Sequence, residues 1–276
     1  MSDLLDHFLK TWDLTDPRPL ARTATSEVFL VLRQGTRVVL KLLTDAGVED
    51  ERAGAVALRC FDGRGAVRLL RVHERAHLLE YAGGDDLLPL VRGGGDDQAT
   101  AIIAEVLQRL HAASPDAPPV GLRPLRSWFR ALFRQAAGEC AAGRSSLFVR
   151  AAGVAESLLR HPREVRVLHG DIHHRNIRRH PERGWLAFDP KGLVGERTFD
   201  AANTLCNPLE LPELVENEKR LRSTAGLLAE RLELDGGRVL SFTFAYAALS
   251  ASWLLREGAD AAHSLKMADL AERSLR

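Results

Sequence analysis

The sequence has little of what marks several large protein classes. Its 276 residues include only three cysteines, Cys60, Cys140 and Cys206, and their spacing matches no metal-ligand pattern. We therefore expect reduced thiols rather than a disulfide framework or a zinc site. The formal net charge is +1, so the chain also lacks the basic excess that is typical of a nucleic-acid-binding protein.

Long apolar runs are missing as well. No stretch approaches the about 18 consecutive apolar residues that a membrane span needs, and the richest one, residues 242–255, is too short and carries several hydroxyl groups. The first residues lack the basic and then apolar pattern of a secretory signal. We therefore expect a soluble, cytoplasmic protein that binds neither membranes nor nucleic acid. The sequence leaves its oligomeric state open.

Two common nucleotide-binding signatures are absent. There is no G-x-x-x-x-G-K-[ST] phosphate loop in the chain. Gly63-x-Gly65 lacks the third glycine and the strand-to-helix context of a dinucleotide fingerprint. A nucleotide site in this chain must therefore use other residues.

The most informative segment covers residues 167–176, which read Val-Leu-His-Gly-Asp-Ile-His-His-Arg-Asn and are followed by Phe188-Asp189-Pro190. Phosphoryl transfer needs a carboxylate that orients and deprotonates the attacking hydroxyl. It also needs oxygen ligands that hold Mg²⁺ on the nucleotide phosphates. Asp171 fits the first role, and Asn176 and Asp189 fit the second. The pattern therefore indicates a phosphoryl-transfer site.

A lysine upstream supports the same chemistry. Lys41 lies near the end of the β-like run at residues 37–43, and acidic residues follow on the next expected helix. This order fits a lysine that holds nucleotide phosphates and is itself held by a carboxylate. Glu51 is the favoured partner because its helical phase is suitable, although Glu49 and Asp50 could serve equally well from sequence alone.

The histidines of the loop allow a competing interpretation. Together with Asp171 they form an H-x-D-x-H-H cluster, as in a hydrolase that activates water on zinc. That interpretation needs further ligands elsewhere and leaves Lys41 without a role. We interpret His169 as structural, with ring nitrogens bonded to nearby backbone. We interpret His173 as shaping the loop and His174 as its more exposed neighbour.

Hydrophobic patterning predicts an α+β protein with two lobes. β-rich runs cover residues 28–32, 37–43, 66–70 and 77–81, with a break at residues 16–19 and a helix at 49–60. Helices are expected at residues 96–113, 125–142, 145–160, 214–232 and 239–256 and near the C-terminus, with a β-like insert at 165–189. We expect a nucleotide-binding lobe at residues 1–82, a hinge near 80–84, and a helical lobe at 83–276 that carries the catalytic loop at 168–177.

At these residues the chain resembles the aminoglycoside phosphotransferase family, whose fold is similar to that of protein kinases. The similarity is greatest to its branch of streptomycin 6-kinases and hydroxyurea phosphotransferases. The resembling segments cover nearly the whole chain: residues 39–42, 62–70, 168–177, 184–200 and 245–253.

The resemblance implies transfer of the γ-phosphate of ATP, with Mg²⁺, to a hydroxyl of a small molecule. By this resemblance Asp171 is the catalytic base, and Asn176 and Asp189 are the Mg²⁺ ligands. Lys41, held by Glu51, contacts the α- and β-phosphates. The backbone of Glu80, Tyr81 and Ala82 contacts adenine, and Asp200 braces the catalytic loop.

The turn at residues 22–27 stands where such folds place a glycine-rich loop, yet it contains no glycine. Its small hydroxyl residues could present backbone N–H groups, or it could be a plain polar turn. The choice of ATP over GTP is open.

The acceptor is the least defined part of the expectation. Streptomycin is cationic, so an acid-lined pocket would suit it. Candidate acids are Glu210, Glu213, Glu216, Glu218, Glu257 and Asp260, although a solvated helix face explains them equally well. The alternatives are a kinase of a sugar, amino alcohol or hydroxyurea-like metabolite, a nucleotide-binding pseudoenzyme, and the zinc hydrolase.

Overall fold

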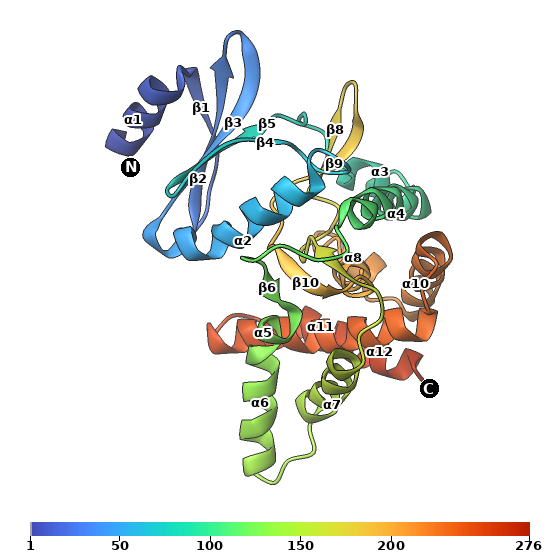
Figure 1. The fold of residues 1–276 in the computed structure, drawn as a ribbon. Helices are drawn as coiled ribbons and strands as arrows, with labels where there is room; N and C mark the ends of the chain where they lie inside the picture. Colours follow the sequence, from blue (N-terminus) through green and yellow to red (C-terminus); the bar gives the residue numbers. More distant parts are fainter. Residues whose placement is uncertain (1) are drawn as a thin grey trace.

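The structure, a computed structural model, describes residues 2–276. Helix α1 (Ser2–Trp12) precedes a five-stranded antiparallel sheet with the strand order β1-β2-β3-β5-β4. Its strands are β1 (Thr15–Arg22), β2 (Ser26–Arg33), β3 (Thr36–Leu43), β4 (Leu69–His73) and β5 (Ala76–Glu80). Helix α2 (Asp45–Phe61) connects β3 to β4 and runs from the sheet toward the helical part of the molecule (Figure 1).

The sheet differs from expectation at its first strand. Pro17 and Pro19 predicted a break, but their segment forms β1 at the sheet edge, with every residue exposed. An edge strand tolerates proline because one of its sides needs no backbone donors. Strands β2 and β3 form a hairpin, and Gln34 and Gly35 at its tip both have positive φ, as a tight hairpin turn requires.

Helix α2 begins four residues before the predicted start. The side chain of Thr44 accepts a hydrogen bond from the N–H of Gly47 and so caps the helix. The helix ends at Phe61, and its C-cap residue Asp62 adopts the left-handed conformation. Its buried face contributes Leu58 and Phe61 to the larger hydrophobic core. A smaller core lies between α1 and the sheet.

The rest of the chain is mainly helical. Its helices are α3 (Leu88–Arg92), α4 (Asp96–Ala113), α5 (Leu125–Trp128), α6 (Arg130–Ala141), α7 (Leu147–Arg160), α8 (Phe199–Leu205), α9 (Pro212–Val215), α10 (Glu218–Leu232), α11 (Gly236–Arg256) and α12 (Ala262–Ser274). A sheet of order β6-β10-β7 combines β6 (Arg123–Pro124), β10 (Leu193–Glu196) and β7 (Val165–Leu168). Strands β8 (Ile177–His180) and β9 (Gly184–Ala187) form a hairpin that reaches toward β4 and β5 (Figure 1).

Helix α11 is long and apolar enough, by length and composition, to cross a membrane. However, 67% of its most apolar window is buried inside the protein, as in the core helix of a soluble protein. Figure 1 shows α11 running through the helical part, with α12 beside it. Its apolar character is explained by this central position.

Candidate active site

The loop after β7 is fixed by one buried carboxylate. Asp200, near the start of α8, accepts hydrogen bonds from the N–H groups of His169 (3.0 Å) and Gly170 (2.8 Å). His111 of α4 places its Nε2 3.0 Å from the same carboxylate. Gly170 has a φ of +82°, and a Cβ there would lie 2.8 Å from the Leu193 side chain. The tight turn therefore needs both glycine and the Asp200 brace.

The loop histidines hold the loop's shape. His169 is fully buried; its Nε2 donates to the Phe188 carbonyl (2.9 Å), and its Nδ1 accepts from the Asp171 N–H (3.3 Å). Burial lowers its pKa, so the ring is neutral, as these two bonds require. His173 accepts from a backbone N–H two residues on.

His174 contradicts its expected exposure. It is fully buried, and neither ring nitrogen has a partner within residues 2–276. Burial lowers its pKa to about 4. The ring is directed into the protein because its segment packs against the start of α3, where the His174 carbonyl accepts from the N–H of Leu87. With the nitrogens of His169 engaged and His174 enclosed, the zinc interpretation loses two of its ligands.

Asp171 presents a carboxylate that is held from one side and open on the other. Its Oδ1 accepts from the amide of Asn203 on α8 (2.8 Å). Its Oδ2 lies 3.4 Å from the Asn176 amide and 3.5 Å from the ammonium of Lys191. The side chain is 27% exposed and lines a large cavity. A carboxylate with fixed orientation and one open face is suited to accept a proton from a bound hydroxyl.

Asn176 lies next to Asp189 through a backbone contact. The carbonyl of Asn176 accepts from the N–H of Phe188, the residue before Asp189 (3.0 Å). Its side-chain amide donates to the Asp171 carbonyl (2.8 Å), which leaves its Oδ1 to accept or ligate. An amide oxygen and a carboxylate are ligands that Mg²⁺ takes alongside substrate phosphates. This pair of oxygen donors fits such an ion.

Lys41 joins the sheet to this segment. Its Nζ lies 2.6 Å from Oε2 of Glu51 on α2 and 2.5 Å from Oδ1 of Asp189. The structure therefore pairs Lys41 with Glu51 rather than with Glu49, and both glutamates line the cavity. Burial alone would raise the pKa of Asp189, but the ammonium groups of Lys41 and Lys191 hold it well below its usual range.

Two glycines bring α2 against the Asp189 segment. A Cβ at Gly54 would lie 2.4 Å from the Pro190 carbonyl, and a Cβ at Gly192 would lie 2.0 Å from the Ala53 carbonyl. Gly192 also has a φ of +64°. Only glycine permits this backbone approach, which we call the glycine contact. It sets the distance between Glu51 and Asp189.

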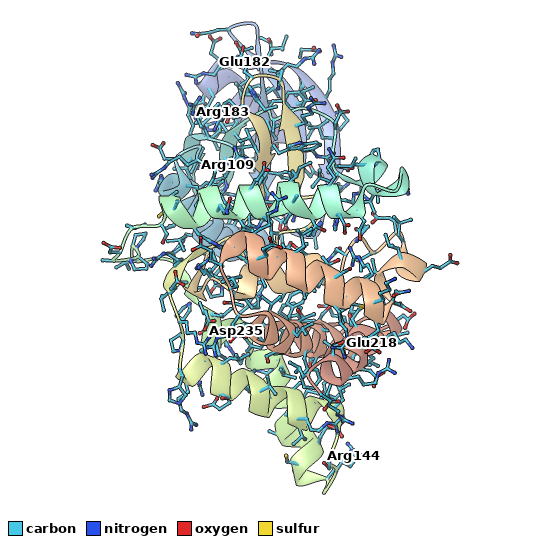
Figure 2. The ribbon with its side chains drawn as sticks, turned by 90° about the vertical axis from the view of Figure 1, so that its right-hand side faces the viewer. Arg109, Arg144, Glu182, Arg183, Glu218 and Asp235 are labelled. Atoms are coloured by element: carbon cyan, nitrogen blue, oxygen red, sulfur yellow. The ribbon has the colours of Figure 1, made fainter. Side chains whose placement is uncertain are left out.

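The expected adenine segment lies at the end of β5. The Glu80 side chain is engaged within the protein: it pairs with Arg183 of the β8–β9 turn and accepts from the Arg68 N–H (2.9 Å). The N–H of Ala82 has no hydrogen-bond partner within residues 2–276. Gly83 follows, and a Cβ there would lie 2.3 Å from the Arg179 carbonyl of β8. Figure 2 labels Arg183 beside the hairpin.

The turn between β1 and β2 offers few free donors. The N–H groups of Thr25 and Ser26 donate to the Thr23 hydroxyl, and the Thr23 N–H donates to the Ser26 carbonyl. The turn is therefore closed by its own hydrogen bonds, which favours the plain polar interpretation over a set of backbone donors.

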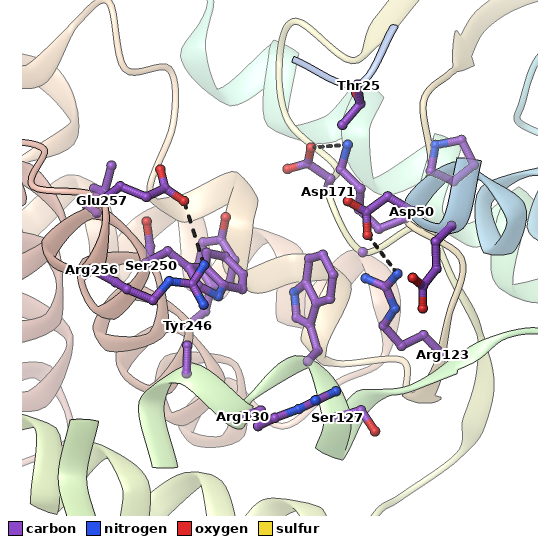
Figure 3. A pocket seen from close by; sticks show the side chains of 18 of the residues that line it. Thr25, Asp50, Arg123, Ser127, Arg130, Asp171, Tyr246, Ser250, Arg256 and Glu257 are labelled. Atoms are coloured by element: carbon purple, nitrogen blue, oxygen red, sulfur yellow. Dashed lines mark hydrogen bonds and ion pairs between the residues drawn. The ribbon is translucent and has the colours of Figure 1, made fainter. Parts of the chain in front are cut away.

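The cavity beside Asp171 has a volume of about 790 Å³ and lies between α2, α5, α6 and α11 (Figure 3). Trp128 and Trp253 form part of its wall, with ring centroids 5.2 Å apart in a T-shaped arrangement. Tyr246 also lines the cavity, and burial raises its pKa well above the ordinary value, so its hydroxyl stays protonated. A drug-sized molecule fits this volume.

Most of the candidate acids lie outside the cavity. Of them only Glu257 lines it, and the other acids of the lining are Glu49, Asp50, Glu51 and Asp171. Three of the other candidates form ion pairs elsewhere: Glu210 with Arg175, Glu216 with His263, and Glu218 with Arg222. Four arginines border the cavity as well, namely Arg123, Arg130, Arg134 and Arg256. The lining therefore carries charges of both signs, and Figure 3 shows Arg256 and Glu257 on one flank and Arg123 with Asp50 on the other.

Comparison with known proteins identifies the family. The family described as aminoglycoside/hydroxyurea antibiotic resistance kinase matches residues 11–258. The chain belongs to this family. A streptomycin 3''-kinase of Klebsiella pneumoniae is 39% identical to this kinase over 258 residues, which cover 91% of this chain and 92% of the relative. A streptomycin 6-kinase of Streptomyces griseus is 36% identical over 256 residues, with coverages of 90% and 80%.

The kinase shares its fold with solved aminoglycoside phosphotransferases. One is a thermostable mutant of APH(4)-Ia in ternary complex with AMP-PNP and hygromycin B, which matches with a TM-score of 0.67 and 15% identity over 100% of this chain and 98% of that chain. The predicted α+β, kinase-like fold and the predicted family are therefore confirmed. The kinase is an O-phosphotransferase of small molecules.

Two residues of the kinase's site escaped the sequence analysis. Lys191 places its Nζ 3.1 Å from Oδ2 of Asp189, and Asn203 holds Asp171. Lys191 stands two positions after Asp189 in the sequence, and this closeness to an expected metal ligand was the available signal. Asn203 gave none, because only the packing of α8 against the loop brings it to Asp171.

Proposed function

We propose that this kinase acts in the cytoplasm and transfers the γ-phosphate of ATP, with Mg²⁺, to a hydroxyl of an aminoglycoside such as streptomycin. One observation carries the proposal: the oriented carboxylate of Asp171 borders a cavity of about 790 Å³ and is close to the Lys41–Glu51–Asp189 group. Relatives named streptomycin kinases and a structural neighbour that binds AMP-PNP support it. All three cysteines are free, in keeping with a reducing compartment.

The proposed division of labour follows the site. Asp171 accepts the acceptor's proton; Lys41, held by Glu51, contacts the α- and β-phosphates; Asp189 and Asn176 hold Mg²⁺, which neutralises phosphate charge when bound. The backbone at Glu80–Ala82 receives the adenine, for which the unpartnered Ala82 N–H is available. We assign residues 1–82 to a nucleotide-binding lobe and 83–276 to a lobe that carries the catalytic loop.

A coupled ATP-consumption assay tests the acceptor. We expect turnover with streptomycin above that with hydroxyurea, common sugars and amino alcohols, and NMR of the product would locate the phosphorylated hydroxyl. The Asp171→Ala variant should lower kcat by about 100-fold or more while ATP affinity changes little. Near-wild-type turnover in that variant would contradict the assignment of Asp171.

A metal titration tests the second half of the site. Asp189→Ala should weaken the Mg²⁺ dependence of nucleotide binding, because one of two proposed oxygen ligands is lost. Calorimetric ATP titrations at several Mg²⁺ concentrations measure this effect. An unchanged Mg²⁺ dependence would remove Asp189 from the ligand set.

A second candidate is a kinase of a non-antibiotic metabolite. Arg130 and Arg134, one turn apart on α6, line the cavity and have no ion-pair partner within residues 2–276. Two free guanidinium groups suit a neutral or acidic acceptor better than a cationic one. Phosphorylation of such a metabolite, without phosphorylation of streptomycin, would favour this candidate. A nucleotide-binding pseudoenzyme is disfavoured because Lys41, Asp171, Asn176 and Asp189 are all in place.

A further inference from the structure

Lys191 occupies the space between the two carboxylates of the site. Its Nζ lies 3.1 Å from Oδ2 of Asp189 and 3.5 Å from Oδ2 of Asp171, and its side chain borders the large cavity. Its backbone N–H donates to the carbonyl of His169 (2.7 Å), and Gly192 follows in the glycine contact. The position of this ammonium group is thus fixed by the same backbone that fixes the catalytic loop.

The two lysines of the site share Asp189 but differ in their other partners. Lys41 contacts Oδ1 and retains Glu51 as a second carboxylate, whereas Lys191 contacts Oδ2 and has Asp171 as its other carboxylate. A ligand that takes the oxygens of Asp189 therefore leaves Lys41 with Glu51. It leaves Lys191 beside Asp171, at the wall of the acceptor cavity.

Lys191 can act in this site only as a cation. An ammonium group between two carboxylates has three hydrogen-bond donors and no acceptor, so it can stabilise negative charge but cannot take up a proton. The closed turn at Thr23–Ser26 offers few backbone donors to phosphate oxygens. A further cation near the phosphates can therefore stabilise negative charge that the turn does not stabilise.

We propose that Lys191 is a catalytic residue whose ammonium group contacts the phosphoryl group in transit between ATP and the acceptor hydroxyl. This proposal rests on the proposed function. In the step, the bond from the γ-phosphorus to its bridging oxygen breaks and its electron pair leaves with ADP. The bond from the acceptor oxygen to phosphorus forms, and the acceptor proton passes to Asp171. Lys191 keeps its protons and stabilises the negative charge on the equatorial oxygens.

The test compares Lys191→Met, Lys191→Arg and Lys191→Ala with wild type, and with Lys266→Met as a matched control on the exposed side of α12. We expect Lys191→Met to lower kcat by about 100-fold or more and to change KM for either substrate by less than about threefold. Arg should restore part of the loss. Added ethylammonium, but not ethanol, should raise the turnover of the Ala variant, because only a cation replaces the missing group.

A binding measurement gives a readout besides activity. With Mg²⁺ present, ADP should bind Lys191→Met about as well as wild type, whereas ADP with aluminium fluoride, which imitates the phosphoryl group in transit, should bind more weakly by about the factor lost in kcat. A purely structural role would weaken both complexes equally, and ethylammonium would not restore turnover. Equal weakening of both complexes, a lack of rescue, or a kcat of Lys191→Met within about fivefold of wild type would each overturn the proposal.

The proposed function and the role of Lys191 can fail separately. If wild type phosphorylates none of the tested acceptors, slow hydrolysis of ATP by water and binding of the aluminium fluoride complex still measure the effect of Lys191→Met. If wild type does phosphorylate an acceptor while Lys191→Met equals it, Lys191 fails and the proposed function stands. If the Met variant unfolds at assay temperature, the Arg variant and the Ala rescue decide.

Discussion

The ammonium nitrogen of Lys41 lies 2.5 Å from Oδ1 of Asp189, although 148 positions separate the two residues. The contact joins β3 to the segment that follows β9, and Glu51 of α2 shares the same nitrogen at 2.6 Å. Three parts of the chain thus meet at one cation, and the side chain of Lys41 is only 10% exposed. Changes at this point are expected to act on the nucleotide rather than on the acceptor.

Replacing Lys41 by Met should raise the KM for ATP by about tenfold or more and leave the acceptor KM nearly unchanged. The variant loses its proposed phosphate contact and leaves the carboxylates of Glu51 and Asp189 without their shared counter-ion. Steady-state kinetics in both substrates measure the effect. Lys10→Met on α1, an exposed position, is the control. An unaltered ATP dependence would place the nucleotide elsewhere.

Asn203→Ala should lower kcat by roughly tenfold, less than loss of Asp171 itself, because the carboxylate remains but loses the donor that orients it. The amide of Asn203 donates to Oδ1 of Asp171 at 2.8 Å, and Asn207 donates to Asn203 in turn. Kinetics of the single variants and of the double variant with Asp171→Ala provide the measurement. If the two losses multiply fully in the double variant, Asn203 acts independently of Asp171.

His174 should make the stability of the fold depend on pH. Its pKa is lowered from an ordinary 6.5 to about 4 by burial, with Arg220 nearby adding to the shift and Asp96 opposing it. Between about pH 6.5 and pH 4, His174 is protonated in the unfolded chain but neutral in the folded chain. The free energy of unfolding therefore decreases as pH falls through this range. At pH 5 the loss attributable to this ring is about 2 kcal/mol relative to neutral pH.

Urea unfolding of wild type and His174→Leu at pH 7 and pH 5 measures this loss. The leucine has no ring to protonate, so its stability should fall about 2 kcal/mol less between the two pH values. Equal falls in both proteins would show that the acid sensitivity resides in other groups, of which His77, with a pKa of about 4, is the next candidate.

Two helical glycines allow a matched test of the glycine contact. A Cβ at Gly54 of α2 would meet the Pro190 carbonyl at 2.4 Å, whereas a Cβ at Gly138 of α6 would meet no atom within 4 Å. Gly138→Ala should stabilise the protein by about 0.5–1 kcal/mol through helix propensity. Gly54→Ala should destabilise it by about 1–3 kcal/mol and lower ATP affinity, because α2 must shift with Glu51. A similar increase in the free energy of unfolding in both variants would show that α2 can shift away from the Pro190 carbonyl without loss of stability.

The parts of the site that sequence could predict are those that local order encodes. Asp171, Asn176 and Asp189 lie within a short loop and just after a strand, and Lys41 lies in a run rich in the β-branched and apolar residues that favour strands. Their mutual order along the chain was enough to suggest one site. Helix α4 was predicted to the residue because acids at its start and an apolar stripe define it.

The parts that sequence could not predict depend on which side of a segment packs against the rest of the protein and which side borders a cavity or solvent. Glu210 and Glu218 looked like a pocket lining, but each carboxylate pairs with an arginine close by, and helical phase does not reveal which side borders a cavity. The exposure expected of His174 was wrong for the same reason. The break predicted from Pro17 and Pro19 was wrong because proline is compatible with an edge strand. Whether a strand lies at an edge depends on the whole sheet and cannot be seen in the local sequence.

The β8–β9 hairpin bears on how spent nucleotide leaves. Arg183 pairs with Glu80, and Gly83 lies against the Arg179 carbonyl, so the connection between the sheet and the helices is fastened on both sides. A wide swing of the sheet would have to break these contacts. The exposed turn at Thr23 and Ala24 is held to α2 by the hydrogen bond from the Thr44 hydroxyl to the Ala24 carbonyl (3.0 Å). We therefore expect ADP to depart by displacement of this turn rather than by an opening at Gly83, so that breaking the Thr44 hydrogen bond should speed the release of ADP.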